Sequence, residues 1–236
     1  KGDLQMHSTW SDGTQSIKEM AEAARELGYE YIAITDHTGD LRIAGGLDEK
    51  ALLKYMAEIE RADKELAGYR ILKGAEVNIR KDGTLDVSDK ILAKLDIVLA
   101  AVHSSFKMPR AEMTKRIIRA MENPNVNVIV HPTGRVIQKR EGYEIDFEEI
   151  LKAAKRTGTA LEINAYPDRL DLNDVHIKKA IEAQVKLSIG TDSHSKIQLP
   201  YLELGVAQAR RGWATKKDII NCLGYNELVE FLRKKK

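Results

Sequence analysis

The chain has 236 residues, and its 38 lysines and arginines nearly balance its 36 aspartates and glutamates, which leaves a formal net charge of +2. This balance excludes a protein that holds nucleic acid by bulk electrostatics alone, so any contact with a polyanion must be local. With 43% hydrophobic residues, 31% charged residues and 5 prolines, the composition also excludes a disordered chain, a collagen and a disulfide scaffold.

Cys222 is the only cysteine, so neither an intrachain disulfide nor a thiolate zinc site can form, which favours a reducing, cytoplasmic location. No apolar run approaches the roughly 18 residues that a membrane span needs. The chain begins at Lys1 without a methionine and enters a dense motif almost at once, from which we expect a fragment of a longer polypeptide. Because there is no linker, repeat or low-complexity block, we expect one domain over residues 1–236.

Short apolar runs alternate with longer amphipathic runs, which is the pattern of a parallel α/β sheet or barrel. In chain order it predicts seven strands, at residues 3–7, 31–35, 70–77, 97–102, 126–130, 160–164 and 186–189. Helices are predicted at residues 16–27, 48–66, 109–121, 147–156 and 173–184, followed by two further helical stretches and a solvated Lys-Lys-Lys tail. The length alone leaves two small domains open, but the uniform pattern predicts a single seven-stranded (βα) barrel.

Five of the six histidines follow the ends of predicted strands: His7, His37, His103, His131 and His194. Chance would place only about one histidine in these positions, and in such barrels the loops after the strands converge on one mouth. Three carboxylates have similar positions: Asp12, Glu76 and Asp192. The sixth histidine, His176, lies within a predicted helix, and we interpret it as a packing residue.

The chemistry of this group predicts a metal cluster. Imidazole and carboxylate ligands without thiolates suit Zn, Mn or Fe, and eight or nine groups exceed the three or four that one ion requires. Several divalent ions together can activate water and hold phosphoryl oxygens. Hydrolysis of a phosphate ester is therefore the favoured class of reaction.

Seven segments resemble, in order and spacing, the PHP (polymerase and histidinol phosphatase) domain: DLQMHSTWSDG, AITDHT, GAEVNI, VHSSF, VIVHPTGR, LEINAYPDRLD and SIGTDSHS. The fifth and sixth segments look most like the C-terminal PHP domain of bacterial and archaeal family X DNA polymerases. The resemblance covers nearly the whole chain and implies a distorted seven-stranded TIM-like barrel with three divalent metal ions at the C-terminal ends of the strands. It also implies a manganese-favouring phosphoesterase that trims DNA 3′ ends, with a polymerase domain upstream as its partner.

The resemblance further implies three sets of metal ligands: Gln5, His7, Glu76 and Asp192; Glu76, His103 and His131; and Asp12, His37 and His194. Glu76 would bridge the first two ions, and Asp36 would support the ligands. The catalytic residues would be Glu76, His7, Asp192 and His194.

Gln5 stands where most family members have histidine. A neutral amide oxygen binds Zn more weakly than imidazole does and tolerates harder ions better. We interpret Gln5 as tuning the first site towards Mn; the alternative is an inactivated site.

The motifs after the fifth and sixth strands favour a 3′–5′ exonuclease in DNA repair, with 3′-end cleaning or abasic-site cleavage as further activities. Basic residues of the neighbouring loops and helices could contact the phosphate backbone: Lys107, Arg110, Lys115, Arg116, Arg135, Lys139 and Arg140. About half of these would be the solvated face of a helix.

The alternative function is a phosphomonoesterase that acts on a small metabolite such as histidinol phosphate, with Arg42, Arg135 or Arg169 holding the phosphate. A third hypothesis, a metal-bound docking module for the polymerase, would require an inactive site. The eight intact ligands argue against it.

Overall fold

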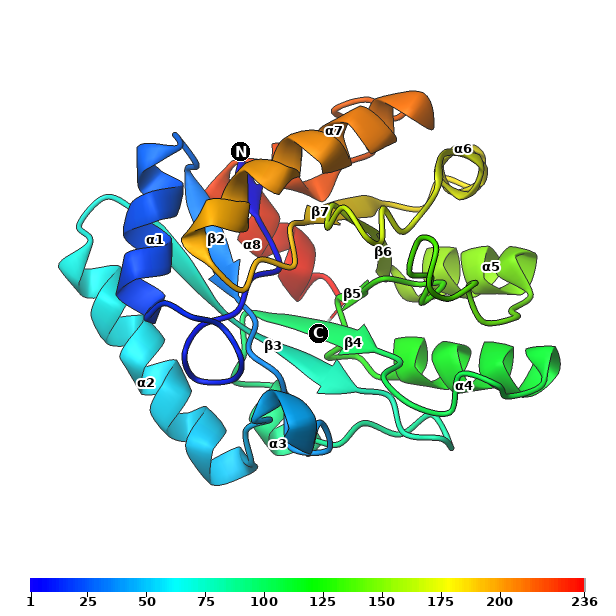
Figure 1. The fold of residues 1–236 in the computed structure, drawn as a ribbon, viewed down its shortest axis with the longest axis horizontal. Coiled ribbons are helices and arrows are strands. Elements are labelled where there is room, and N and C mark those ends of the chain that lie inside the picture. Colours follow the sequence, from blue (N-terminus) through cyan, green and yellow to red (C-terminus); the bar gives the residue numbers. More distant parts are fainter. Residues whose placement is uncertain (236) are drawn as a thin grey trace.

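Seven parallel strands form one sheet in the order β1 to β7 and curl into a nearly closed barrel (Figure 1), in a computed structural model that describes residues 1–235. The strands are β1 (Gly2–Asp3), β2 (Tyr31–Ile34), β3 (Arg70–Asn78), β4 (Ile97–Ala101), β5 (Val128–Ile129), β6 (Ala160–Asn164) and β7 (Leu187–Gly190). This confirms the predicted α/β barrel of seven strands.

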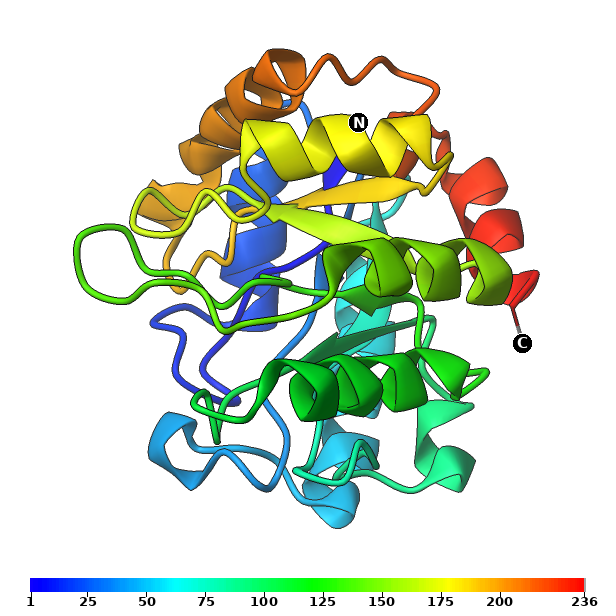
Figure 2. The same ribbon diagram turned by 90° about the vertical axis from the view of Figure 1, so that its right-hand side faces the viewer.

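The helices lie outside the strands, and Figure 2 shows α4, α5 and α6 side by side on one outer face. The helices are α1 (Ile17–Glu26), α2 (Glu49–Glu65), α3 (Asp89–Leu92), α4 (Arg110–Glu122), α5 (Phe147–Thr157), α6 (Asp174–Glu182), α7 (Leu202–Arg211) and α8 (Tyr225–Arg233). Short 3₁₀ turns occupy η1 (Arg42–Ala44), η2 (Lys196–Tyr201) and η3 (Ile220–Cys222). Within residues 1–235, no helix is both long and apolar enough to cross a membrane.

Strands β1 and β7 do not pair in a regular ladder. The barrel closes between them through hydrogen bonds of the residues near the mouth. The Asp3 carboxylate accepts a hydrogen bond from the Thr191 amide at 3.1 Å. Further on, Asp192 N donates to Gln5 O at 3.0 Å, and His7 N donates to Ser193 O at 2.8 Å. The predicted first strand, residues 3–7, is shorter than expected, because its regular ladder with β2 covers only Gly2 and Asp3, and Met6 makes single contacts with Thr35 on one side and Ser193 on the other.

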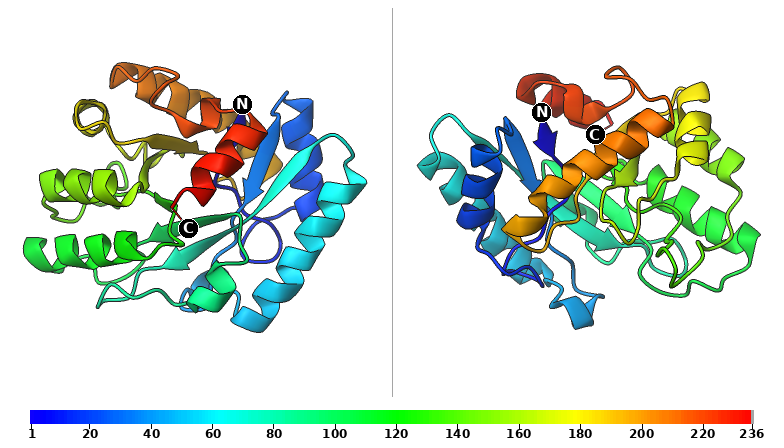
Figure 3. Two further views of the ribbon diagram at one scale, coloured as in Figure 1. Left: turned by 180° about the vertical axis from the view of Figure 1, so that it is seen from behind. Right: turned by 45° about the horizontal axis from the view of Figure 1, so that its top comes forward.

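Helix α8 packs across the opposite end of the barrel, as Figure 3 shows from behind. Its Leu228 and Leu232 are buried in a cluster that also contains Tyr31 and Ile97, the first residues of β2 and β4. The tail after α8 was expected to be solvated, and this is wrong for Lys235. Its ammonium group is part-buried and donates to Met121 O at 2.9 Å, while Lys236 lies outside the described residues.

We predict that Leu228→Ala lowers the free energy of unfolding by about 2–5 kcal/mol, because it leaves a cavity at the barrel end that α8 fills. Glu230→Ala, on the exposed face of the same helix, is the control and should change it by no more than about 0.5 kcal/mol. Urea denaturation measures both values. Equal losses in the two variants would show that α8 does not seal the barrel.

Candidate metal centre

Glu76, near the end of β3, is the centre of the site. Its carboxylate is fully buried, and Oε1 lies 2.9 Å from both His103 Nε2 and His131 Nε2. Its other oxygen, Oε2, lies 3.4 Å from His7 Nε2 and 3.5 Å from His37 Nδ1. One carboxylate therefore joins histidines that follow four different strands.

A second group lies where β1 meets β7. His7 Nε2 is 3.1 Å from Asp192 Oδ1. The Gln5 side chain is fully buried and donates from Nε2 to Glu76 Oε2 at 3.0 Å. Gln5 thus lies within the cluster, although it turns its amide nitrogen towards Glu76.

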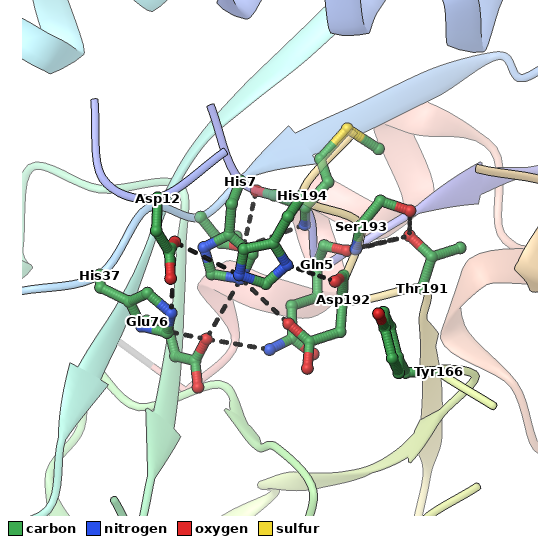
Figure 4. A network of polar contacts seen from close by, with 12 residues as sticks. Gln5, His7, Asp12, His37, Glu76, Tyr166, Thr191, Asp192, Ser193 and His194 are labelled. Atoms are coloured by element: carbon green, nitrogen blue, oxygen red, sulfur yellow. Dashed lines mark hydrogen bonds and ion pairs between the residues drawn. The ribbon is translucent and has the colours of Figure 1, made fainter. Parts of the chain in front are cut away.

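The third group is more open and gathers around Asp12, as Figure 4 shows. Asp12 Oδ1 lies 3.3 Å from His194 Nε2 and 3.8 Å from His37 Nε2. The ring of His7 stacks against those of His37 and His194, with centroids 4.4 and 4.3 Å apart. All nine side chains that the resemblance assigns therefore lie in one continuous cluster.

The electrostatics of the cluster suit cation binding. Burial opposes the charge of Glu76, but the surrounding histidines outweigh it and hold the pKa of this carboxyl well below its usual range. Burial lowers the pKa of His37 to about 4 and also lowers the pKa of His131. At His7, by contrast, burial is outweighed by the hydrogen bond and charge of Asp192, which raise the pKa to about 9, so a metal at this imidazole would displace a proton.

The residues present fit divalent metal ions. Three overlapping groups have donor atoms within 4.8 Å of one another: His7, Asp12, His37 and His194; His37, Glu76 and His103; and His7, Glu76 and Asp192. His7 Nδ1 and His131 Nδ1 are buried and have no hydrogen-bond partner in the part of the chain that the structure describes. Buried nitrogens of this kind call for a ligand or a water.

Two supporting residues were missed by the sequence reasoning. Asn78 Oδ1 accepts a hydrogen bond from His103 Nδ1 at 2.7 Å, which fixes this ring in the way that partners of metal-binding histidines do. Glu162 Oε2 accepts from the His131 amide at 2.8 Å. Asn78 lies two residues after Glu76, so the strand period could have placed both on one face.

Asp36 supports the loop that carries Asp12. Its carboxylate accepts hydrogen bonds from the Ser8 amide at 2.8 Å and from the hydroxyls of Ser8 and Ser11, both at 2.6 Å. These contacts put Asp36 behind the loop after β1, with its oxygens occupied by donors of that loop.

Two of the predicted phosphate-binding arginines, Arg169 and Arg135, have different surroundings. Arg169 lies at the mouth, with Nε 3.5 Å from Asp192 Oδ2. Arg135 donates from Nε to the Arg169 carbonyl at 2.8 Å and from Nη2 to the Leu170 carbonyl. Arg135 therefore braces the loop that presents Arg169.

Three further basic candidates differ in their exposure. Arg42 and Lys107 are exposed on the loops after β2 and β4. Arg116 was a candidate for contact with a DNA backbone, but it is buried and donates to the carbonyls of Arg80 and Ser104 at 3.0 and 2.8 Å. His176 packs on the Phe147 ring at 4.2 Å, as expected of a packing residue.

Known proteins are similar to this chain in sequence and in fold. The profile of the PHP domain matches residues 3–166. The DNA polymerase/3′-5′ exonuclease PolX of Bacillus subtilis is 47% identical over 234 residues, which are 99% of this chain and 41% of that protein. A probable phosphatase of Thermoanaerobacter is 32% identical over 245 residues, which are 99% of this chain and 95% of that protein.

A solved structure gives the same fold. Histidinol phosphate phosphatase from Lactococcus lactis, complexed with Zn, L-histidinol and phosphate, has a TM-score of 0.63 and 19% identity, covering 90% of this chain and 93% of that chain. The barrel, its cluster of histidines and carboxylates, and the profile match lead to one family. The chain belongs to the PHP domain family of metal-dependent phosphoesterases.

Proposed function

We propose that this chain hydrolyses phosphodiester bonds at DNA 3′ ends as a 3′–5′ exonuclease in DNA repair. The observation that carries the proposal is the 47% identity to PolX across 99% of the chain, against 32% for the probable phosphatase. The chain spans 41% of that PolX protein, so we also propose an attached polymerase region as its partner in DNA repair.

Three divalent ions would be held by the three ligand sets, two of which share Glu76, with manganese favoured for activity. Such ions activate a water molecule and neutralise the charge of phosphoryl oxygens. Glu76, His7 and Asp192 would hold the ions that contact the scissile phosphate, while His194 and Asp12 complete the open side of the cluster, where side chains are about one third exposed.

Basic residues border the cluster on two sides, which supports a polymeric substrate. Arg169 stands beside Asp192 and can contact a phosphate oxygen. A cavity of about 170 Å³ adjoins His103 and is also lined by Arg80, Lys81 and Ser104. Arg80 already pairs with Asp40 of the same cavity at 2.7 Å, so Lys81 is the cation that would meet a phosphate next to the scissile one.

The phosphomonoesterase alternative has one specific observation in its favour. The Thermoanaerobacter relative is matched over 95% of its own length, so its whole chain resembles this one. In that function Arg169 would hold the terminal phosphate, and the cavity beside His103 would have no role.

We predict that the parent protein, purified without chelator, contains about three divalent ions per chain, and that Glu76→Gln loses most of them because two ligand sets share this carboxylate. Glu144→Gln, at an exposed position, should keep the full content. Elemental analysis gives the ion count, and circular dichroism checks that each variant is folded. The cluster would be refuted by hydrolytic activity in a protein with one ion or none.

We predict that Gln5→His tightens Zn binding at the first site and moves the metal preference away from Mn, because imidazole suits Zn better than an amide oxygen does. The ratio of hydrolysis rates with Mn and with Zn should fall in the variant. Competitive metal titration gives the same comparison without activity. An unchanged ratio and unchanged affinities would mean that Gln5 does not tune the site.

The function itself is tested with labelled single-stranded and gapped DNA in Mn, beside a panel of phosphomonoesters. We predict stepwise shortening from the 3′ end and slow hydrolysis of the monoesters. Lys81→Ala should reduce kcat/KM on DNA about fivefold at low salt, less at high salt, and leave the monoesters unaffected.

The matched control is Lys155→Ala, in the last turn of α5, which leads back to the opposite end of the barrel. It should behave as the parent on every substrate. Faster turnover of a monoester than of DNA would favour the metabolite phosphatase.

A further inference from the structure

Tyr166 stands at the mouth, two residues after the end of β6. Figure 4 shows its side chain beside Asp192. The ring is met edge-on by Tyr201, with centroids 5.6 Å apart and planes at 88°. Its hydroxyl accepts a hydrogen bond from Gln198 Nε2 at 3.4 Å. The ring is therefore fixed at one edge and at its polar tip.

These supports tie the ring to the metal cluster. Gln198 Oε1 accepts from the His194 amide at 2.7 Å, so the residue that positions the tyrosine also positions a candidate ligand. The Tyr166 carbonyl accepts from the Arg169 amide at 2.8 Å, which puts the ring and that guanidinium on the same turn. An aromatic ring and a cation thus flank Asp192 together.

Packing in the core does not account for this ring. Tyr166 is only part-buried, and neither hydrophobic cluster among residues 1–235 includes it. A different aromatic residue at the mouth, Phe106, has a ring face covered by the Arg140 guanidinium at 4.1 Å. The contacts of Tyr166 with Tyr201 and Gln198 are instead at the edge of the ring and at its hydroxyl. This arrangement suits a ring on which a planar ligand stacks.

We propose that Tyr166 is a stacking platform for the nucleobase of the terminal nucleotide, while Arg169 contacts the phosphate of that nucleotide. This inference rests on the proposed action at DNA ends and makes Tyr166 a specificity-determining residue for it. Stacking on an aromatic ring accepts every base, since each has a π-face, and removing such a ring costs about 1–3 kcal/mol per base. A substrate without a base gains nothing from Tyr166.

The test measures binding of two products that differ only in the base: deoxyadenosine 5′-monophosphate and 2-deoxyribose 5-phosphate. Isothermal titration to the metal-loaded protein should show the nucleotide binding about 5- to 150-fold more tightly than the sugar phosphate. Tyr166→Leu should abolish this preference and leave the sugar phosphate affinity unchanged. Tyr166→Phe, which removes only the hydroxyl, should keep most of the preference.

Two results would overturn the proposal. One is a parent protein that binds the two phosphates equally, or does not bind the nucleotide. The other is a Tyr166→Leu variant that weakens both ligands by the same factor, as a merely structural tyrosine would.

Parallel digestion of DNA separates this inference from the exonuclease proposal. A base preference that depends on Tyr166, without hydrolysis of DNA, would retain the platform and reject the exonuclease. Hydrolysis of DNA with no base preference in the parent would retain the exonuclease and reject the platform. DNA ending in an abasic 3′ nucleotide should be cut equally by the parent and by Tyr166→Leu.

Discussion

The burial of one carboxylate, Glu76, is the constraint on which the rest of the site depends. An anion removed from water costs several kcal/mol unless opposite charges or hydrogen-bond donors surround it. Here the histidines that follow β1, β2, β4 and β5 each place a ring nitrogen within 3.5 Å of the Glu76 oxygens, and the Gln5 amide donates a hydrogen bond to one of them. The barrel brings these strand ends around β3, so the fold and the cation site have the same geometric requirement.

Backbone strain at the mouth is a second sign that the site is built for a purpose beyond folding. His131 and Asp192 have positive φ angles of 33° and 56°, which are unfavourable for residues with a side chain. Such conformations cost on the order of 1–3 kcal/mol each and persist where the surroundings enforce them. Glu162 enforces the first by accepting from the His131 amide, and the β1–β7 closure enforces the second.

The sequence was sufficient to predict the barrel and the gathering of the histidines, because strand periodicity and the position of a residue after a strand are local properties. Glu162 could not be found in this way. Within an apolar strand it reads as an outward-facing charge, whereas burial, reinforced by the charge of Asp192, raises its pKa well above the usual range. Its role depends on β5 and β7, which are distant in sequence.

The arginines show the same limit. Arg135 lies four residues after His131, and spacing alone favoured it as a phosphate contact, but a loop can turn its side chain to either side. The carbonyls of Arg169 and Leu170 attract its guanidinium, so Arg169 takes the place beside Asp192. The part-buried ammonium of Lys235 escaped prediction for a related reason, since its oxygen partners come from two distant segments, residues 121–126 and Thr159.

The most direct test of the central role of Glu76 is anomalous diffraction from crystals grown with Mn. The account predicts about three peaks at the mouth, two of them on either side of the Glu76 carboxylate. A single peak that does not touch Glu76, or ions bound only outside the barrel mouth, would contradict it.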